Sequence, residues 1–220
     1  DICVIPHAEL TEEFVRCGIA RDTILPAGIP VRAAFRDHGD RAAARKALGL
    51  PAQGRHIVLM SGSIGCGPMG DVAEDLDIRM ADGDFASVLC GSNKQMRCAL
   101  ELRRLYRVEA VGFTTQVPLY MDSADVLVTK PGGISITEAG TRGVPLLLAD
   151  MVGGCETRNQ EFFTAHGWAG ECPPEDMASS ALRFLDDGAA SAAIVDAQRR
   201  GFDGLAADRI AAAVLARCKS

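Results

Sequence analysis

Residues 126–138 have the order of residue types that makes an anion-binding site between a strand and a helix. An apolar run at 126–128 precedes Lys130 and Pro131, and the pair Gly132-Gly133 then leads into a helix-like segment. At such a junction, exposed backbone N–H groups and the positive end of the helix dipole converge on a ligand above the glycines. Phosphate is therefore the ligand that this segment predicts.

A second loop of small residues follows the apolar run at 57–60. Its glycine spacing, G-x-x-G-x-G, matches neither the dinucleotide-binding fingerprint nor a Walker A sequence, so hydrolysis of nucleoside triphosphates is not expected. By itself the loop is also compatible with a turn that only permits close packing. Together with the first loop it predicts a diphosphate ligand, and its candidate contacts are Gly62, Ser63, Gly65 and Gly67.

Two side chains beside the first loop each have two candidate roles. Ser135 and Glu138 have the spacing of a capping box, in which Glu138 bonds back to the backbone at the start of the helix. Alternatively, a carboxylate one turn into a phosphate-binding helix accepts hydrogen bonds from both hydroxyls of a ribose. Lys130 either pairs with phosphate or covers the end of the strand.

Other candidates follow neighbouring strands. Gly112 and Phe113 come after a short strand at 108–111, where Phe113 either stacks on a base or packs in the core. Glu156 and Asn159 are three residues apart at the start of a helix and share a face. They either bind sugar hydroxyls or are first-turn residues that the helix dipole favours.

Strand-like and helix-like segments alternate along the chain. We expect strands at 1–6, 23–25, 57–60, 85–90, 108–111, 125–129, 144–149 and 168–171. Helices are expected at 9–17, 41–48, 69–80, 93–106, 116–122, 135–142, 157–166 and 174–187, with a C-terminal helix within 189–217. This alternation predicts an α/β protein with a Rossmann-like parallel sheet flanked by helices. Ligands of such sheets bind beyond the carboxyl ends of the strands, where all the loops above would lie.

A hinge is expected at residues 27–31, because a glycine followed by an X-Pro step interrupts both helix and strand. Residues 1–30 are then the tail of a neighbouring domain, and residues 31–220 are the ligand-binding domain. The chain starts without Met and without a secretory signal, so we expect a fragment of a cytoplasmic protein.

Composition excludes several classes of protein. The net charge of −6 argues against a binder of nucleic acid, and no apolar run approaches the roughly 18 residues of a membrane span. The eight cysteines contain no C-x-x-C pair, so neither zinc nor a disulfide framework is expected. The four histidines are not expected to cluster. The strand at 85–90 ends without the acidic residue that holds ribose in a Rossmann dehydrogenase.

The motifs, in this order, resemble the family 28 GT-B glycosyltransferases, especially monogalactosyldiacylglycerol synthases and processive diacylglycerol glucosyltransferases. The matching segments are the linker 28–31, the loop 60–68, and the segments 90–94, 112–115, 124–133, 137–139 and 154–159. Two positions depart from the pattern. Residues 61–64 read Ser-Gly-Ser-Ile where relatives tend to carry a run of glycines, and Cys155 stands where they usually have glutamine.

The resemblance implies the C-terminal half of a GT-B fold, which holds a UDP-sugar, with residues 1–30 as the tail of an N-terminal acceptor domain. It implies Phe113 at the uracil, Glu138 at the ribose, and Glu156 with Asn159 at the sugar. The remaining UDP-sugar contacts would be Gly112 and the two loops, the second of which supplies Lys130, Pro131, Gly132, Gly133, Ile134 and Ser135.

The implied activity is inverting transfer of a hexose from a UDP-sugar to a lipid acceptor, such as diacylglycerol, by a peripheral protein at the cytoplasmic membrane face. Helix N-termini and backbone N–H groups would stabilise the leaving diphosphate, so no metal is required. The catalytic base belongs, in relatives, to the N-terminal domain, so no catalytic residue is assigned here. The alternative is a non-catalytic UDP-sugar-binding subunit that needs a separate acceptor-domain partner.

Overall fold

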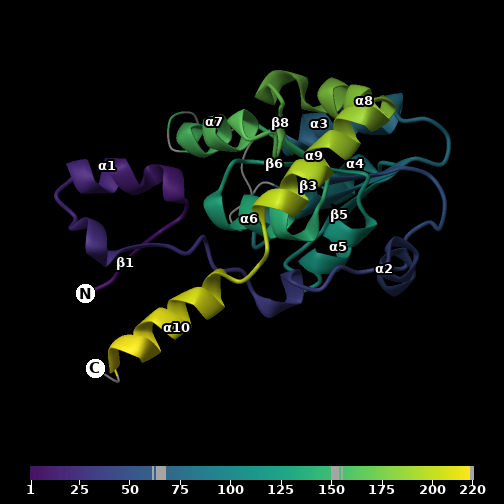
Figure 1. The fold of residues 1–220 in the computed structure, drawn as a ribbon. Helices are drawn as coiled ribbons and strands as arrows, with labels where there is room; N and C mark the ends of the chain where they lie inside the picture. The colour runs from purple at the N-terminus through teal and green to yellow at the C-terminus, as the bar shows by residue number, and fades with distance from the viewer. Residues whose placement is uncertain (61, 63–67, 150–153, 155, 219–220) are drawn as a thin grey trace.

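The computed structural model describes residues 1–60, 62, 68–149, 154 and 156–218 (Figure 1). Its main sheet has six parallel strands in the order β5-β4-β3-β6-β7-β8. The strands are β3 (His56–Met60), β4 (Phe85–Leu89), β5 (Val108–Val111), β6 (Val126–Thr129), β7 (Leu146–Leu148) and β8 (Gly170–Glu171). The chain reverses direction across the sheet between β3 and β6, as in a doubly wound Rossmann fold. The predicted fold class is confirmed.

Helices cover both faces of this sheet, and each face has its own core. On one face Ile57 and Leu59 pack with residues of α3 (Met69–Arg79), α4 (Lys94–Arg103) and α8 (Met177–Asp186). On the other face Val58 and Met60 share a core with residues of α5 (Val117–Ser123), α6 (Gly133–Arg142) and α7 (Thr157–Ala165). Partly buried residues of α2 (Arg41–Leu48) and α9 (Gly188–Gly201) pack against that second core.

The central strands are largely apolar because both of their faces are covered. Every residue of β3, β4, β6 and β7 is buried. Parallel strands buried on both sides read as continuous hydrophobic runs rather than as alternating patterns. This explains why the runs at 57–60 and 126–128 predicted strands correctly.

The N-terminal segment, residues 1–30, forms a separate small unit. Strands β1 (Cys3–Ile5) and β2 (Ile24–Pro26) pair in parallel, with α1 (Thr11–Arg16) and the 3-10 turns η1 (Ala8–Leu10) and η2 (Arg21–Thr23) between them. The C-terminal helix α10 (Ala206–Cys218) returns to this unit, where Arg209 Nη1 donates to Ala27 O at 3.1 Å. In Figure 1 the purple N-terminal segment and the yellow α10 lie together at one side of the main sheet.

Several boundaries differ from the sequence prediction. The single helix expected within 189–217 is wrong, since α9 and α10 are separated at 202–205, where Phe202 is extended and packs on Trp168 with ring centroids 4.7 Å apart. The helices expected at 9–17 and 174–187 both begin with a 3-10 turn, at η1 and at η4 (Pro174–Asp176), and η3 (Ala33–Phe35) follows the hinge. In the described part of the chain, no helix is long and apolar enough to cross a membrane. Every cysteine there is free.

Candidate functional site

The carboxyl ends of the strands meet at one edge of the sheet, as predicted. Met60 pairs with Leu89 on one side and with Thr129 on the other, and Thr129 pairs with Leu148. Thr129 Oγ1 also donates to Met60 O at 2.7 Å, which ties the ends of β3 and β6 together. The loops after β3, β4, β5, β6 and β7 therefore leave the sheet side by side.

Helix α6 begins directly after the glycine turn that follows β6. Gly132 N donates to Lys130 O at 2.8 Å, and Gly132 is the N-cap, with no side chain capping the helix. The first intrahelical donor is Ile136, whose N–H bonds Gly132 O at 3.1 Å. The N–H groups of the first turn precede that bond, so they are available to an anion at the positive end of the helix.

The capping-box interpretation of Ser135 and Glu138 is wrong. The helix starts two residues earlier than predicted, so Ser135 lies inside its first turn and is partly exposed. The spacing of Ser135 and Glu138 fits a capping box only if the helix begins at Ser135, and spacing alone does not reveal where the helix begins. The actual start depends on how tightly the chain turns at Gly132.

Glu138 is instead a buried carboxylate with a partner from the hinge. The residue is 5% exposed, and its Oε1 accepts a hydrogen bond from Arg32 Nε at 3.2 Å. Burial raises the pKa of Glu138, and the neighbouring Arg32 opposes that rise. The Arg32 side chain is 62% exposed and lies over the Phe35 ring. Because its guanidinium already contacts solvent, moving away from the carboxylate would not uncover a buried charge.

Lys130 and Glu156 form an ion pair across the loops that follow β6 and β7. Lys130 Nζ and Glu156 Oε1 are 2.5 Å apart, and both side chains are partly exposed. A Cβ atom at Gly132 would lie 3.2 Å from that Nζ, and one at Gly62, where φ is +81°, would lie 2.7 Å from Lys130 Cε. Glycine at both positions therefore leaves room for the lysine.

Asn159 joins the same group of residues. Its Nδ2 donates to Pro131 O at 2.9 Å, and its backbone N–H donates to Glu156 O at 2.9 Å. Glu156 is the N-cap residue of α7 and its side chain makes no capping bond. The structure thus brings together Lys130, Pro131, Glu156 and Asn159, all of which the sequence singled out.

Two apolar candidates lie on the surface. Phe113 is 77% exposed and Ile134 is 64% exposed. The interpretation of Phe113 as a core residue is therefore wrong. It follows Gly112, where a Cβ atom would lie 2.9 Å from Arg97 Nη1. Three other candidates, Ser63, Gly65 and Gly67, lie outside the described residues.

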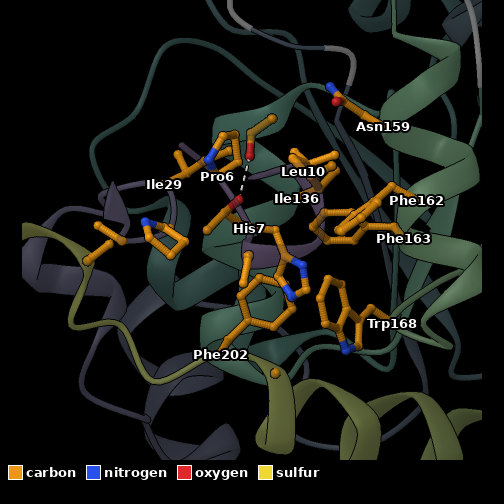
Figure 2. A pocket seen from close by; sticks show the side chains of 18 of the residues that line it. Pro6, His7, Leu10, Ile29, Ile136, Asn159, Phe162, Phe163, Trp168 and Phe202 are labelled. Carbon is orange, nitrogen blue, oxygen red and sulfur yellow. Dashed lines mark hydrogen bonds between the residues drawn. The ribbon is translucent and has the colours of Figure 1, made fainter. Parts of the chain in front are cut away.

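A pocket of about 710 Å³ adjoins the site, between the N-terminal segment and helices α6 and α7 (Figure 2). Gly133 and Asn159 belong to its wall, so the pocket is continuous with the loop after β6. Its other lining is largely apolar and includes Leu10, Phe14, Ile29, Phe162, Trp168 and Phe202. The sequence analysis missed this pocket because its walls come from segments that are far apart in the chain.

The expectation that the histidines form no cluster is also wrong. The rings of His7 and His166 lie 5.3 Å apart, at the contact between the N-terminal segment and the end of α7. His56, in contrast, is fully buried at the start of β3, where burial lowers its pKa to about 3.

Comparison with known proteins identifies the family. Residues 71–201 match the family described as glycosyl transferases group 1, and the chain belongs to it. The chain is 29% identical over 163 residues to the processive diacylglycerol beta-glucosyltransferase of Staphylococcus saprophyticus, with 73% of this chain and 41% of that protein covered. It is 30% identical over 173 residues to the chloroplastic monogalactosyldiacylglycerol synthase of Spinacia oleracea, with 75% and 33% covered.

These relatives confirm the resemblance stated from the motifs, and the chain spans less than half of their length. Among solved structures, Anabaena Alr3699/HepE in complex with UDP and glucose has a TM-score of 0.63 at 17% identity, with 98% of this chain and 62% of that chain covered. At this identity the likeness concerns the fold.

Proposed function

We propose that this chain is the donor-binding part of an inverting glycosyltransferase, which moves a hexose from a UDP-sugar to a lipid acceptor such as diacylglycerol. In this proposal residues 31–220 bind the donor, and residues 1–30 are the tail of an N-terminal acceptor domain that supplies the catalytic base. The protein would act peripherally at the cytoplasmic face of a membrane. The names of the relatives, which act on diacylglycerol or synthesise its galactoside, support the acceptor class.

One observation carries the proposal: a buried carboxylate lies one turn above a helix N-terminus that no side chain caps. Glu138 is paired with Arg32, a largely exposed arginine just after the hinge, and the first-turn N–H groups of α6 follow directly from Gly132. A ribose diol presents two donors to the two carboxylate oxygens, while the adjacent diphosphate takes the helix end. One helix thus offers a partner to each of the two polar groups of a nucleoside diphosphate.

The other candidates take roles consistent with their positions. Phe113 would stack on the uracil, and Gly112 would let the base approach the backbone. Lys130, with the loops at Gly62 and Pro131, would neutralise the diphosphate after exchanging its partner Glu156 for phosphate oxygen. Glu156 would then accept hydrogen bonds from the sugar hydroxyls, and Asn159 would donate hydrogen bonds to them.

The chemical step is a displacement at the anomeric carbon. The acceptor oxygen forms a bond to that carbon from the face opposite the diphosphate, while the bond to the diphosphate oxygen breaks and its electron pair leaves with UDP. The acceptor proton goes to the base of the acceptor domain. The N–H groups of α6 stabilise the charge that develops on the diphosphate, and this stabilisation is electrostatic and preorganised. No metal is assigned to this step.

Calorimetric titration with a ligand panel tests the proposal. UDP, UDP-glucose, UDP-galactose, UDP-N-acetylglucosamine and NAD are titrated into the chain and into its Glu138→Gln variant. We expect UDP and at least one UDP-sugar to bind, NAD not to bind, and Glu138→Gln to weaken UDP. Glu175→Gln is the matched control, because Glu175 is exposed in η4. Absence of UDP binding to the wild-type chain would overturn the proposal.

A further inference from the structure

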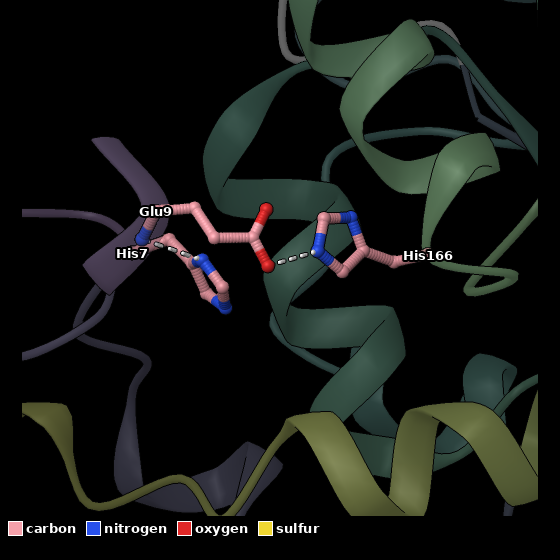
Figure 3. Close-up of side chains that lie close together, drawn as sticks. All are labelled: His7, Glu9 and His166. Atoms are coloured by element: carbon pink, nitrogen blue, oxygen red, sulfur yellow. Dashed lines mark hydrogen bonds and ion pairs between the residues drawn. The ribbon is translucent and has the colours of Figure 1, made fainter. Parts of the chain in front are cut away.

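Three metal-ligating side chains meet where the N-terminal segment contacts the end of α7 (Figure 3). His7 and Glu9 come from the start of the chain, and His166 is the C-cap residue of α7. One ligand atom from each residue lies within 4.8 Å of the others. The two histidines are partly exposed and Glu9 is exposed, so a solvent ion has access to all three.

The hydrogen bonds of His166 leave a position for a cation beside Glu9. His166 Nδ1 is 2.7 Å from Phe162 O, which can only accept, so Nδ1 carries a proton. In the neutral ring, Nε2 then presents a lone pair to Glu9 Oε1 at 3.1 Å, and that oxygen is also an acceptor. Two acceptors at this distance require a positive charge between them, which is either a proton or a metal ion.

The geometry around His166 matches that of a metal ligand. Histidine ligands usually donate their second N–H to a carbonyl or carboxylate, which fixes the tautomer and the ring. His166 does so to Phe162 O, and its ring also stacks on Trp168 with centroids 4.4 Å apart. With bonds of about 2.1 Å, the ligand atoms of a tetrahedral zinc site lie roughly 3.4 Å from one another. Glu9 Oε1 and His166 Nε2, at 3.1 Å, are within about 0.3 Å of that spacing.

His7 supplies the third ligand. Its Nδ1 accepts the backbone N–H of Glu9 at 3.3 Å, so this nitrogen carries a lone pair on the side of Glu9. The bond is long, and coordination of an ion would exchange one weak hydrogen bond for a much stronger interaction. The His7 ring already contacts Phe162 and His166 edge-on, with centroids 5.1 and 5.3 Å apart.

We propose that His7, Glu9 and His166 bind one divalent transition-metal ion, for which Zn²⁺ is the best match. Two imidazole nitrogens and one carboxylate oxygen form a set of borderline ligands that suits zinc, with water at the fourth position. The ion would cross-link residues 1–30 to α7 at the rim of the pocket in Figure 2, to which His7 contributes.

The ion has no part in the proposed sugar transfer. His166 and Asn159 are at opposite ends of α7, and seven residues of helix span roughly 10 Å. At the other end of the same helix, Arg158 pairs with Glu13 of α1 at 2.8 Å. The metal would therefore be a second attachment between the N-terminal segment and α7, and the two proposals can fail separately.

The test is calorimetric titration of Zn²⁺ into the whole chain after its thiols have been alkylated, because free thiols compete for zinc and Cys17 and Cys98 are exposed. We expect one ion per chain with a Kd in the micromolar range or below. Glu9→Gln and His7→Ala should each weaken binding by at least about tenfold. Glu12→Gln, a neighbouring exposed carboxylate that pairs with Arg21, is the matched control and should leave binding unchanged.

Thermal unfolding shows that each variant is folded and gives a second readout. Zinc should raise the Tm of the wild type and of Glu12→Gln, and EDTA should reverse the rise, whereas the Tm of Glu9→Gln should not respond. Absence of one-to-one binding by the alkylated wild type would overturn the proposal, as would equal affinity in all variants. A proton alone would then hold Glu9 and His166 together. None of these measurements uses a nucleotide.

Discussion

The two edges of the main sheet both carry charged and polar side chains, but they hold them differently. At the amino ends of the strands, Arg142 and Asp122 pair with each other, and each side chain is 4% exposed. At the carboxyl ends, Glu138 is paired with an arginine that is largely in solvent. The amino edge, which we call the closed edge, thus contains a pair in which both partners are buried. The carboxyl edge, which we call the open edge, contains a pair in which one partner is in solvent and, in our proposal, is exchanged for a ligand.

The closed edge is held by a network rather than by isolated pairs. Arg45, which is buried, donates to Gly54 O at 2.9 Å and to Asp125 Oδ2 at 3.0 Å. Asp125 Oδ2 also accepts the backbone N–H of His56 at 2.8 Å. Each of these groups is satisfied within the chain, so this edge specifies the fold. If Glu138 binds the donor as proposed, the way a buried charge is paired, more than its burial, separates this site from a structural pair.

The largest effect is expected from breaking the closed pair. Asp122→Ala leaves the Arg142 guanidinium buried without its counter-ion, and such a loss costs about 3–5 kcal/mol of unfolding free energy. Glu156→Gln breaks the partly exposed pair with Lys130, which can reach solvent, and should cost about 1 kcal/mol or less. Urea denaturation followed by circular dichroism measures both. Equal losses would show that the two edges do not differ in this way.

Substitution at Glu138 should separate binding from stability. Hydrogen bonds to a charged group contribute about 1.5–3 kcal/mol, so Glu138→Gln is expected to weaken UDP by about 10- to 100-fold. Because the pKa of Glu138 in the fold is raised above its unfolded value, ionising the carboxyl lowers stability as pH rises through that pKa. Glu138→Gln has no carboxyl to ionise, so it does not lose stability in this way.

Glu138→Gln should therefore be at least as stable as the wild type at neutral pH. The difference in unfolding free energy should shrink as the pH falls below the pKa of the carboxyl in the unfolded chain. Parallel urea denaturation at several pH values, together with calorimetry, measures both quantities. A variant that keeps its UDP affinity but loses stability would place Glu138 among the structural carboxylates.

His56, at the closed edge, should make the unfolding free energy depend on pH. Its folded pKa of about 3 lies below the unfolded value of 6.5, so the unfolded chain takes up a proton first on acidification. Its contribution to stability is complete above pH 6.5 and is lost, at up to about 1.4 kcal/mol per pH unit, as pH falls toward 3. His56→Gln should reduce this slope.

An NMR titration of the His56 ring checks the same point directly. The ring lies between Ser123 Oγ at 2.9 Å and Ser87 Oγ at 2.7 Å, and it should remain neutral at pH 5. Protonation of the folded ring near pH 6.5 would contradict the assignment.

The smallest effect is expected at the surface of the open edge. Phe113→Ala removes a side chain that is 77% exposed, so stability should change by no more than about 0.5 kcal/mol. If the ring stacks on the uracil, loss of the stack should cost about 1 kcal/mol or more of UDP binding, roughly a fivefold change. Calorimetry with Tyr106→Ala as control separates the two, because Tyr106 is exposed just before β5. Equal UDP affinity of both variants would remove Phe113 from the site.

The sequence predicted the strand–turn–helix order at the open edge because its signals are local. The apolar run at 126–128 and Gly132-Gly133 determine where β6 stops and where α6 begins. The break at Gly201-Phe202-Asp203-Gly204 also had a local signal, in two glycines flanking an aspartate, although the alanine-rich surroundings predicted one helix. Gly204, at a φ of +70°, shows that the turn signal was real.

Features that depend on distant segments could not be read in advance. The pairing of Arg32 with Glu138 requires the hinge to lie over α6, and no residue spacing encodes that contact. The same holds for His7 and His166, and for the aromatic pocket beside them. The exposure of Phe113 was hidden because an aromatic after a strand usually packs inward.

The return of α10 to the start of the chain means that the polypeptide crosses between the two units twice. The crossings lie side by side, since Arg36 Nε donates to Gly204 O at 2.7 Å and Cβ atoms at Gly28 and Ala206 would be 3.3 Å apart. A rotation of residues 1–30 about these crossings would move nearby atoms least and distant atoms most, so the pocket wall that faces α7 would shift far more than the crossings themselves.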